Sequence, residues 1–197
     1  MTKALEESGM HGADFKLLFV CTGNTCRSPM AQIIAARSAG QRGWAKVDIR
    51  SAGVSAFRGG SASEGARLAA EGRGLTLDGH ESTPLDTELV AWADLILTMG
   101  PNHVEVAEAL GGRDKVWMLS AYADMGGPTE GAGVTDPFGG DPQIYRECFE
   151  ALEGLVQDAF FRVEAEFIKP RRESLGPGDE SPGSSAESVS SKEENAT

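Results

Sequence analysis

Hydrophobic and polar positions follow two alternating periods between residues 15 and 168. Short continuous apolar runs, typical of strands buried on both faces, are separated by stretches in which apolar residues recur every three or four positions, as on one face of a helix. Strands are predicted at Phe15–Val20, Lys46–Val54, Asp94–Met99 and Lys115–Leu119. Helices are predicted at Ser28–Ala39, Ser63–Glu71, Asp86–Ala93, Pro101–Leu110 and Pro142–Ile168.

The order of these elements predicts the fold class. Ser28 is a good N-cap for the first helix, Pro29 suits its first turn and Gly40 its end. Strands and helices alternate, which predicts an α/β fold in three layers: a four-stranded parallel sheet with helices on both faces. Ligands bind such folds at the carboxyl ends of the strands, so the loop after the first strand is a candidate site.

Composition divides the chain into three parts. Residues 170–197 contain almost no bulky apolar side chains and many Ser, Gly, Glu and Pro residues, which predicts a disordered acidic tail. Residues 1–14 precede the first strand and are predicted to be a flexible extension. Residues 15–169 therefore form the predicted domain.

Charge and cysteine content narrow the range of functions. The net charge of −12 argues against a nucleic-acid partner. No apolar run approaches the ~18 residues that cross a bilayer, and the N-terminal residues are too charged for a secretory signal. We therefore expect a cytoplasmic protein with no membrane partner, and we expect a monomer. The 3 cysteines do not make a disulfide framework, which leaves them for reactivity or packing.

The sequence VCTGNTCRSPMA, residues 20–31, connects the first strand to the first helix. A Gly-Asn turn can take left-handed conformations that point backbone N–H groups inward, and the helix N-terminus adds a positive field, which predicts a phosphate-binding cradle. Arg27 offers a planar fork for two phosphate oxygens. Cys21 is the predicted nucleophile, its thiolate favoured by the same field and hydrogen-bonded by Ser28. The cradle residues are Thr22, Gly23, Asn24, Thr25, Cys26, Arg27 and Ser28.

Two other interpretations of this loop are weaker. A cysteine at the end of a strand is more often a small core residue, but a core cysteine requires neither a Gly-Asn turn nor an arginine six positions later. Zinc binding is not favoured, because four residues separate Cys21 from Cys26 and the other cysteine and the histidines are scattered. We expect neither a metal nor another cofactor.

The loop CTGNTCRSPMA, the later RSAG and the late TDPFGG resemble the low-molecular-weight protein tyrosine phosphatase family over residues 15–168. Within it, CTGNTCRSPMA and DPFGG are most similar to the bacterial protein arginine phosphatase branch. The family implies a catalytic acid at Asp136, and the chemistry agrees, because a poor leaving group needs a proton. The implied cycle is attack of Cys21 on phosphorus, protonation of the leaving group by Asp136 and hydrolysis of the phosphocysteine to inorganic phosphate.

The resemblance also implies supporting roles. Asn24, Ser51 and His80 match positions of a hydrogen-bond network that holds the loop open. Cys26 matches a second loop cysteine that can form a reversible disulfide with oxidised Cys21. Each has an ordinary alternative: a turn residue, a strand-end hydroxyl, a surface histidine or a packed thiol.

Thr25 decides the predicted substrate. Family members that act on phosphotyrosine usually carry Ile or Leu there, which contacts a flat apolar ring, whereas a threonine hydroxyl suits a polar guanidinium. We therefore expect a phosphorylated protein with phosphoarginine as the substrate, and phosphotyrosine is the alternative. Phe138, expected to wall the pocket, is the second predicted selectivity residue.

Three further functions fit less well. An arsenate reductase-type thiol redox enzyme usually needs another cysteine near the loop, and Cys148 is expected in the core. A non-enzymatic phosphate-binding module would lack the nucleophile or the acid, and a sugar-phosphotransferase component does not need Arg27 and Asp136 together. The tryptophans are expected in the core as well: Trp44, Trp92 and Trp117.

Overall fold

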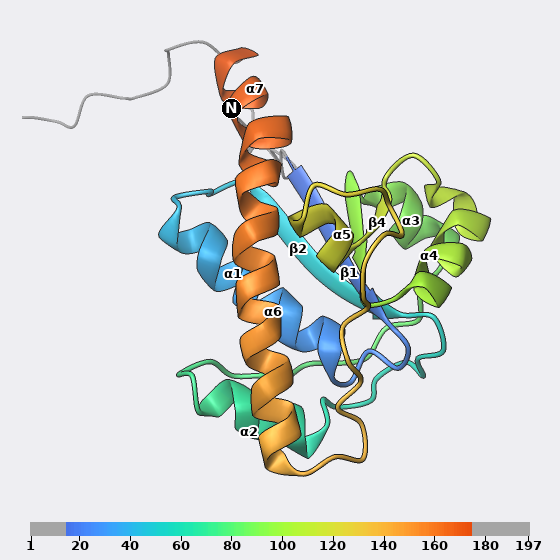
Figure 1. Cartoon of the computed structure of the whole chain (residues 1–197), viewed down its shortest axis with the longest axis vertical. Helices are drawn as coiled ribbons and strands as arrows, with labels where there is room; N and C mark the ends of the chain where they lie inside the picture. The colour runs from blue at the N-terminus through green and yellow to red at the C-terminus, as the bar shows by residue number, and fades with distance from the viewer. Residues whose placement is uncertain (1–14, 175–197) are drawn as a thin grey trace, which may run out of the picture.

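The computed structural model describes residues 15–174, in which strands and helices alternate (Figure 1). The predictions for residues 1–14 and 175–197 lie outside the described residues. The strands are β1 (Phe15–Cys21), β2 (Val47–Gly53), β3 (Leu95–Thr98) and β4 (Val116–Met118). The helices are α1 (Arg27–Gln41), α2 (Glu64–Glu71), α3 (Thr87–Trp92), α4 (Pro101–Ala107), α5 (Leu119–Ala123), α6 (Pro142–Val163) and α7 (Lys169–Ser174). Short π-helical turns, η1 (Glu108–Gly112) and η2 (Glu164–Ile168), follow α4 and α6.

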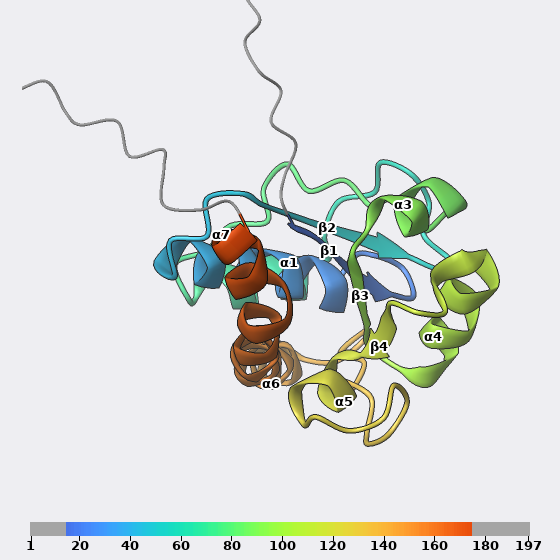
Figure 2. The same ribbon diagram turned by 90° about the horizontal axis from the view of Figure 1, so that it is seen from above.

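The strands form one parallel 4-stranded sheet in the order β2-β1-β3-β4, which confirms the predicted fold class. Figure 2 shows the sheet between two helical layers, with α1, α5 and α6 on one side and α3 and α4 on the other. Cys21 lies beside Gly53 in the register of β1 and β2. The predicted cradle therefore begins at the edge where ligands bind parallel sheets.

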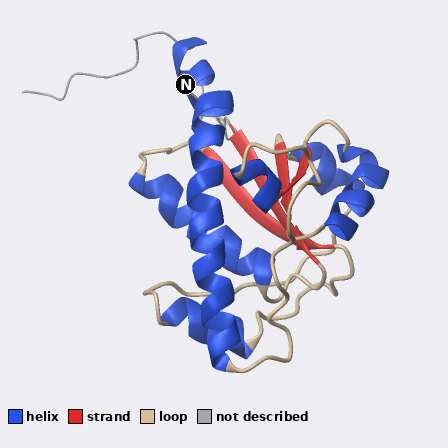
Figure 3. Ribbon diagram, viewed as in Figure 1, coloured by secondary structure: helices blue, strands red, loops and turns tan. Residues whose placement is uncertain are grey.

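Alternate residues of β1 fill two cores. Phe15, Leu17 and Phe19 belong to the core under α1 and α6, and Leu18 and Val20 belong to the core under α3 and α4. All of these side chains are fully buried. Burial on both faces explains why the strand is a continuous apolar run, and Figure 3 shows the strands enclosed by helices.

The tryptophans pack against these cores. Trp44 is buried and stacks on Phe160 of α6, with the ring centroids 5.0 Å apart. Trp92 and Trp117 are half-buried and pack against the core clusters. Trp44 therefore lies in the core as expected, whereas Trp92 and Trp117 lie at its edge.

The residues after β4 differ from the prediction of a longer strand followed by a loop. They form α5, in which Tyr122 is buried and donates a hydrogen bond to Oε2 of Glu166 at 2.7 Å. This contact ties α5 to η2, which lies far along the chain. A distant partner therefore stabilises a short helix that the local sequence does not predict.

Pro170 does not end the last helical segment, although the sequence predicted that the helix ends at Ile168 and the domain at residue 169. Helix α7 follows η2 directly, and the backbone N–H of Lys169 donates to the carbonyl oxygen of Glu164, so Pro170 lies within a continuous helical path. The helical path continues to Ser174. Between residues 15 and 174, no helix combines the length and the apolar character needed to cross a membrane.

Candidate active site

The loop between β1 and α1 folds closely over the end of β2. Asn24 takes the left-handed conformation, with φ of 54°, whereas Gly23, for which the same was predicted, does not. A Cβ on Gly53 would lie 2.6 Å from the carbonyl oxygen of Thr22 and 2.7 Å from the backbone nitrogen of Asn24. Only glycine at position 53 lets the loop approach this closely, and the sequence interpretation did not single it out.

Cys21, the predicted nucleophile, ends β1 with its sulfur at the base of the loop. Ser28 Oγ lies 3.0 Å from Cys21 Sγ, and the backbone N–H of Asn24 donates to the same sulfur at 3.3 Å. The hydroxyl of Ser28 donates to the carbonyl oxygen of Ala52 at 3.2 Å. The prediction of Ser28 as N-cap is therefore wrong: its hydroxyl serves the sulfur and the sheet, and Cys26 is the N-cap of α1.

Asn24 joins the loop to the rest of the domain. Its Nδ2 donates to Ser28 Oγ and Ser51 Oγ, both at 2.9 Å, and its Oδ1 accepts from the backbone N–H of Thr83 at 2.8 Å. Nε2 of His80 lies 2.8 Å from the carbonyl oxygen of Asn24. The structure thus gathers the predicted supporting residues around one buried asparagine.

Arg27 and Asp136 meet although 109 positions separate them. Nη2 of Arg27 donates to Oδ2 of Asp136 at 2.5 Å and to Thr22 Oγ1 at 3.4 Å, and Nη1 donates to the carbonyl oxygen of Val134 at 3.2 Å. Nε of Arg27 is buried and has no hydrogen-bond partner within residues 15–174. An unpaired buried N–H is costly, and an oxyanion in the cradle is a group that satisfies it.

A pocket of about 240 Å³ collects the predicted reactive groups. Thr25 is half-buried in its wall, and Phe138 lines it with 77% of its surface exposed. The predicted nucleophile, the predicted oxyanion fork and the predicted acid therefore line one pocket. The lining residues are Cys21, Thr22, Gly23, Thr25, Cys26, Arg27, Asp136 and Phe138.

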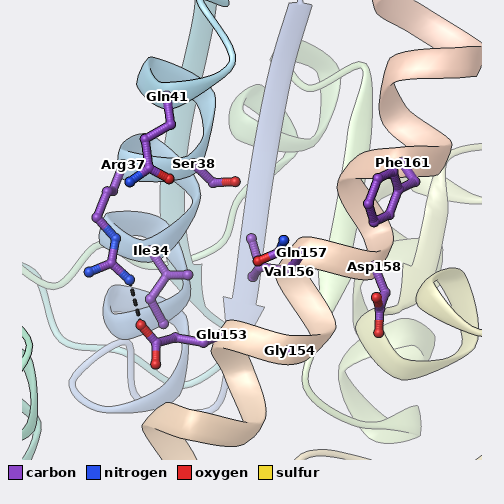
Figure 4. Close-up of a pocket in the computed structure, with 10 residues that line it drawn as sticks. All are labelled: Ile34, Arg37, Ser38, Gln41, Glu153, Gly154, Val156, Gln157, Asp158 and Phe161. Carbon is purple, nitrogen blue, oxygen red and sulfur yellow. Dashed lines mark hydrogen bonds and ion pairs between the residues drawn. The ribbon is translucent and has the colours of Figure 1, made fainter.

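A larger hollow of about 560 Å³ lies between α1 and α6 (Figure 4). Arg37 and Glu153 form an ion pair in its wall, and Gly154 contributes no side chain to it. The residues that line this hollow include neither cysteine nor histidine. The smaller pocket is therefore the better candidate site, because it contains the reactive chemistry.

Cys26 contacts helices α2 and α6 rather than only its own loop. Its Sγ lies 3.1 Å from Ser63 Oγ and 3.7 Å from the hydroxyl of Tyr145. Ser63 caps α2, and its backbone N–H donates to the carbonyl oxygen of Thr25 at 2.9 Å. These contacts brace the second half of the loop. Cys21 and Cys26 are both free thiols.

His103 lies beside the loop and was missed by the sequence interpretation. It belongs to α4, is 1% exposed, and its Nε2 lies 2.9 Å from Thr22 Oγ1. Burial and, secondarily, the charge of Arg27 lower the pKa of His103 to about 4, so the ring is neutral at neutral pH. The position of His103 just after β3 could have identified it as a site residue, because segments at the carboxyl ends of parallel strands converge on one site.

Cys148 occupies the core position that was expected. It is buried on α6, and its thiol donates to the carbonyl oxygen of Thr135 at 3.7 Å. Burial raises the pKa of Cys148 to about 12. This thiol is therefore protonated at neutral pH.

The fold and the site together define a class of protein. A parallel α/β sheet carries, after its first strand, a loop with a cysteine at its base and an arginine at the start of the following helix. Such a site binds an oxyanion beside a nucleophile.

Comparison with known proteins identifies the family. Residues 16–169 match the model described as low molecular weight phosphotyrosine protein phosphatase. The chain belongs to this family, which confirms the resemblance carried by the loop.

Relatives include both arginine and tyrosine phosphatases. The protein-arginine-phosphatase of Bacillus subtilis (strain 168) is 41% identical over 144 residues, which cover 72% of this chain and 91% of that protein. Low molecular weight protein-tyrosine phosphatase A of Mycobacterium tuberculosis (strain ATCC 25618 / H37Rv) is 36% identical over 141 residues, covering 70% of this chain and 85% of that protein. The predicted similarity to bacterial protein arginine phosphatases is confirmed.

Solved structures agree with this placement. A cysteine-to-serine mutant of YwlE arginine phosphatase with a phosphorylated active-site serine superposes with a TM-score of 0.71 at 37% identity, covering 77% of this chain and 97% of that chain. YwlE arginine phosphatase from Geobacillus stearothermophilus gives a TM-score of 0.68 at 32% identity, covering 79% and 96%.

Proposed function

We propose that this protein is a phosphoprotein phosphatase that transfers the phosphoryl group of phosphoarginine to Cys21. The observation that carries the proposal is the one pocket of about 240 Å³ that Cys21, Arg27 and Asp136 all line. Phosphoryl transfer through a covalent intermediate needs a nucleophile, an oxyanion site and an acid within reach of the same phosphorus. Relatives named as protein-arginine and protein-tyrosine phosphatases support this function.

In the first step, the Cys21 thiolate attacks phosphorus. The S–P bond forms while the P–N bond breaks, and the electron pair of the P–N bond goes to the guanidine nitrogen, which takes a proton from Asp136. The N–H of Asn24 donates to the sulfur at 3.3 Å, and the hydroxyl of Ser28, 3.0 Å from the sulfur, can turn its one proton from the carbonyl oxygen of Ala52 to the thiolate. Arg27 and the backbone N–H groups of the cradle bind the non-bridging oxygens.

In the second step, water attacks the phosphocysteine. The S–P bond breaks, the thiolate leaves, and Asp136, now a carboxylate, accepts a proton from the water. Inorganic phosphate is the product. The contact of Arg27 with Asp136 fits both steps, because phosphate binding draws the guanidinium toward the phosphate and frees the carboxyl group for proton transfer.

Thr25 supports phosphoarginine as the substrate. It lines the pocket, half-buried, with its Oγ1 3.6 Å from Cys26 Sγ. A hydroxyl in this wall can hydrogen-bond a polar guanidine, whereas the ring of phosphotyrosine gains nothing from it. The loop opposite offers one aromatic side chain, because Gly139 and Gly140 follow Phe138. The relative with 41% identity carries the name protein-arginine-phosphatase.

Phosphotyrosine is the second candidate substrate. Phe138 lines the pocket with 77% of its surface exposed, and an exposed aromatic face can pack on a phosphotyrosine ring. The thiol redox alternative is disfavoured, because burial keeps Cys148 protonated with a pKa of about 12. A cytoplasmic location and a monomeric state stay predictions.

The substrate assignment is tested by kcat/KM of the full chain on a phosphoarginine-containing protein and on a phosphotyrosine peptide. The wild type is expected to prefer phosphoarginine, and Thr25→Ile should lower that activity and raise turnover of phosphotyrosine. Thr25→Ser is the matched control, because it keeps the hydroxyl. A wild type that prefers phosphotyrosine, or a Thr25→Ile variant that loses both activities equally, contradicts phosphoarginine as the substrate.

The covalent route is tested with Cys21→Ser. This variant should lose turnover of p-nitrophenyl phosphate by orders of magnitude, because a serine hydroxyl is a much weaker nucleophile than a thiolate. Binding of inorganic phosphate, measured by calorimetry, should persist, because the backbone and Arg27 supply it. Appreciable hydrolysis by Cys21→Ser refutes the phosphocysteine intermediate.

A further inference from the structure

His103 is a buried imidazole that the proposed mechanism does not use. It is 1% exposed, and Nε2 contacts the cradle through Thr22 Oγ1 at 2.9 Å. Its other ring nitrogen, Nδ1, is buried without a hydrogen-bond partner in the described part of the chain. A neutral imidazole can donate from only one nitrogen, so these two environments indicate which nitrogen carries the proton.

The unpartnered Nδ1 favours the tautomer protonated at Nε2. If the Thr22 hydroxyl donated to Nε2, the proton of the ring would sit on Nδ1, and a buried N–H would have no acceptor. If Nε2–H donates to Thr22, Nδ1 holds only a lone pair, which is the less costly group to leave unpaired. The pKa of His103, lowered to about 4, keeps the ring in this neutral form at neutral pH.

This tautomer determines what the Thr22 hydroxyl can do. Thr22 Oγ1 already accepts a hydrogen bond from Nη2 of Arg27 at 3.4 Å. With a second bond accepted from His103, both lone pairs of the oxygen are occupied. The hydroxyl proton is then available only for donation. Thr22 is exposed and lines the pocket that contains Cys21, so an acceptor for this proton is a group bound in that pocket.

We propose that His103 is a positioning residue that makes the Thr22 hydroxyl a hydrogen-bond donor to a phosphoryl oxygen in the cradle. The inference rests on the proposed phosphatase function and adds one side-chain donor to the backbone N–H groups and Arg27. The same two bonds orient Thr22 relative to Arg27, whose Nη2 also donates to Asp136. His103 acts indirectly, because its ring contacts Thr22 and not the phosphate.

The tautomer is read directly by isotope-edited nitrogen NMR of the histidine-labelled full chain. The signal that disappears in His103→Phe identifies the residue. At neutral pH we expect a protonated Nε2 and an unprotonated Nδ1. A ring protonated at Nδ1, or at both nitrogens, overturns the proposal, and this readout does not depend on whether the protein turns over any substrate.

The function of the pair is tested by the affinity for inorganic phosphate, measured by calorimetry. Thr22→Val should weaken binding about tenfold, because a hydrogen bond to a charged group is lost, and Thr22→Ser should restore it. His103→Phe should weaken phosphate binding as much as Thr22→Val does. His103→Gln should recover part of the loss, because its amide can donate again. The double variant Thr22→Val/His103→Phe should bind phosphate no more weakly than either single variant. Glu105→Gln, an exposed change on the same helix, is the control.

Two results separate the possible failures. If the single losses multiply in the double variant, or if Thr22→Val binds phosphate like the wild type, His103 does not act through Thr22 and the proposal is overturned. If the wild type binds phosphate with the expected coupling but hydrolyses no phosphorylated substrate, the positioning role stands and the proposed phosphatase function fails.

Discussion

Nη2 of Arg27 lies 2.5 Å from Oδ2 of Asp136, which joins the predicted oxyanion fork directly to the predicted acid. The two side chains differ in exposure, at 8% for Arg27 and 49% for Asp136, so the carboxyl group is reachable from solvent while the guanidinium is enclosed. A phosphate dianion competes with this carboxylate for Arg27 and repels it. We therefore predict that substrate binding and release of the Asp136 carboxyl group are linked through one ion pair.

Asp136→Asn should affect binding and turnover in opposite directions. Without the competing carboxylate, inorganic phosphate should inhibit several-fold more tightly. Turnover of a substrate with a basic leaving group should fall about 100-fold or more, and turnover of p-nitrophenyl phosphate should fall less, because nitrophenolate leaves without a proton. Steady-state kinetics on both substrates provide the measurement.

Glu147→Gln is a suitable control for this experiment, because it removes one negative charge from an exposed position on α6. Glu147→Gln should change the turnover of neither substrate strongly. Equal losses on the two substrates in Asp136→Asn would remove Asp136 as the proton donor.

Mild peroxide should inactivate the protein reversibly. Peroxide oxidises Cys21 to a sulfenic acid, and the thiol of Cys26 then displaces water to form a disulfide that added thiol reduces. To reach Cys21, the Cys26 side chain must turn away from the hydroxyl groups of Ser63 and Tyr145, which lie 3.1 and 3.7 Å from its Sγ. Recovery after thiol treatment should be poor in Cys26→Ala and normal in Cys148→Ala. Full recovery in Cys26→Ala argues against the disulfide.

Stability should depend on the protonation of His103. Its pKa is lowered from 6.5 to about 4 in the folded state, so between these values the unfolded chain binds a proton that the folded chain does not. The contribution of the neutral His103 ring to the free energy of unfolding is fully present above pH 6.5 and is lost as the pH falls through about 4. The difference in free energy of unfolding between wild type and non-titrating His103→Gln should change by about 3 kcal/mol over this range. Urea unfolding at several pH values measures it, and a pH-independent difference would exclude this linkage.

Two glycine-to-alanine substitutions in helices should have opposite effects. A Cβ on Gly65 would lie 2.4 Å from the ring of buried Tyr145, so Gly65→Ala should destabilise the fold by about 1–3 kcal/mol despite a better helix propensity. A Cβ on Gly154, in the wall of the hollow in Figure 4, would meet nothing within 4 Å. Gly154→Ala should therefore stabilise by up to about 1 kcal/mol. Chemical denaturation measures the free energy of unfolding of both variants. Changes of the same sign in the two variants would contradict the packing argument.

The strands and most helices could be predicted because their signals are local. The apolar run at Phe15–Val20 lies within β1, and the capping residue Ser63 and the proline Pro142 stand at the observed starts of α2 and α6. Local signals failed for α5, where Tyr122 depends on Glu166, and at Pro170, which lies inside a helical path that continues from η2 into α7.

By itself, the sequence determined the fold class, the family and the composition of the cradle, because alternating elements and the residues from Cys21 to Ser28 are readable within short stretches of chain. Only the tertiary structure decided the pairing of Arg27 with Asp136, the contact of His103 with Thr22 and the need for glycine at position 53. These relationships join residues from different strands and loops. They depend on how closely the parallel strands bring their carboxyl ends together, and no local pattern of residues specifies that distance.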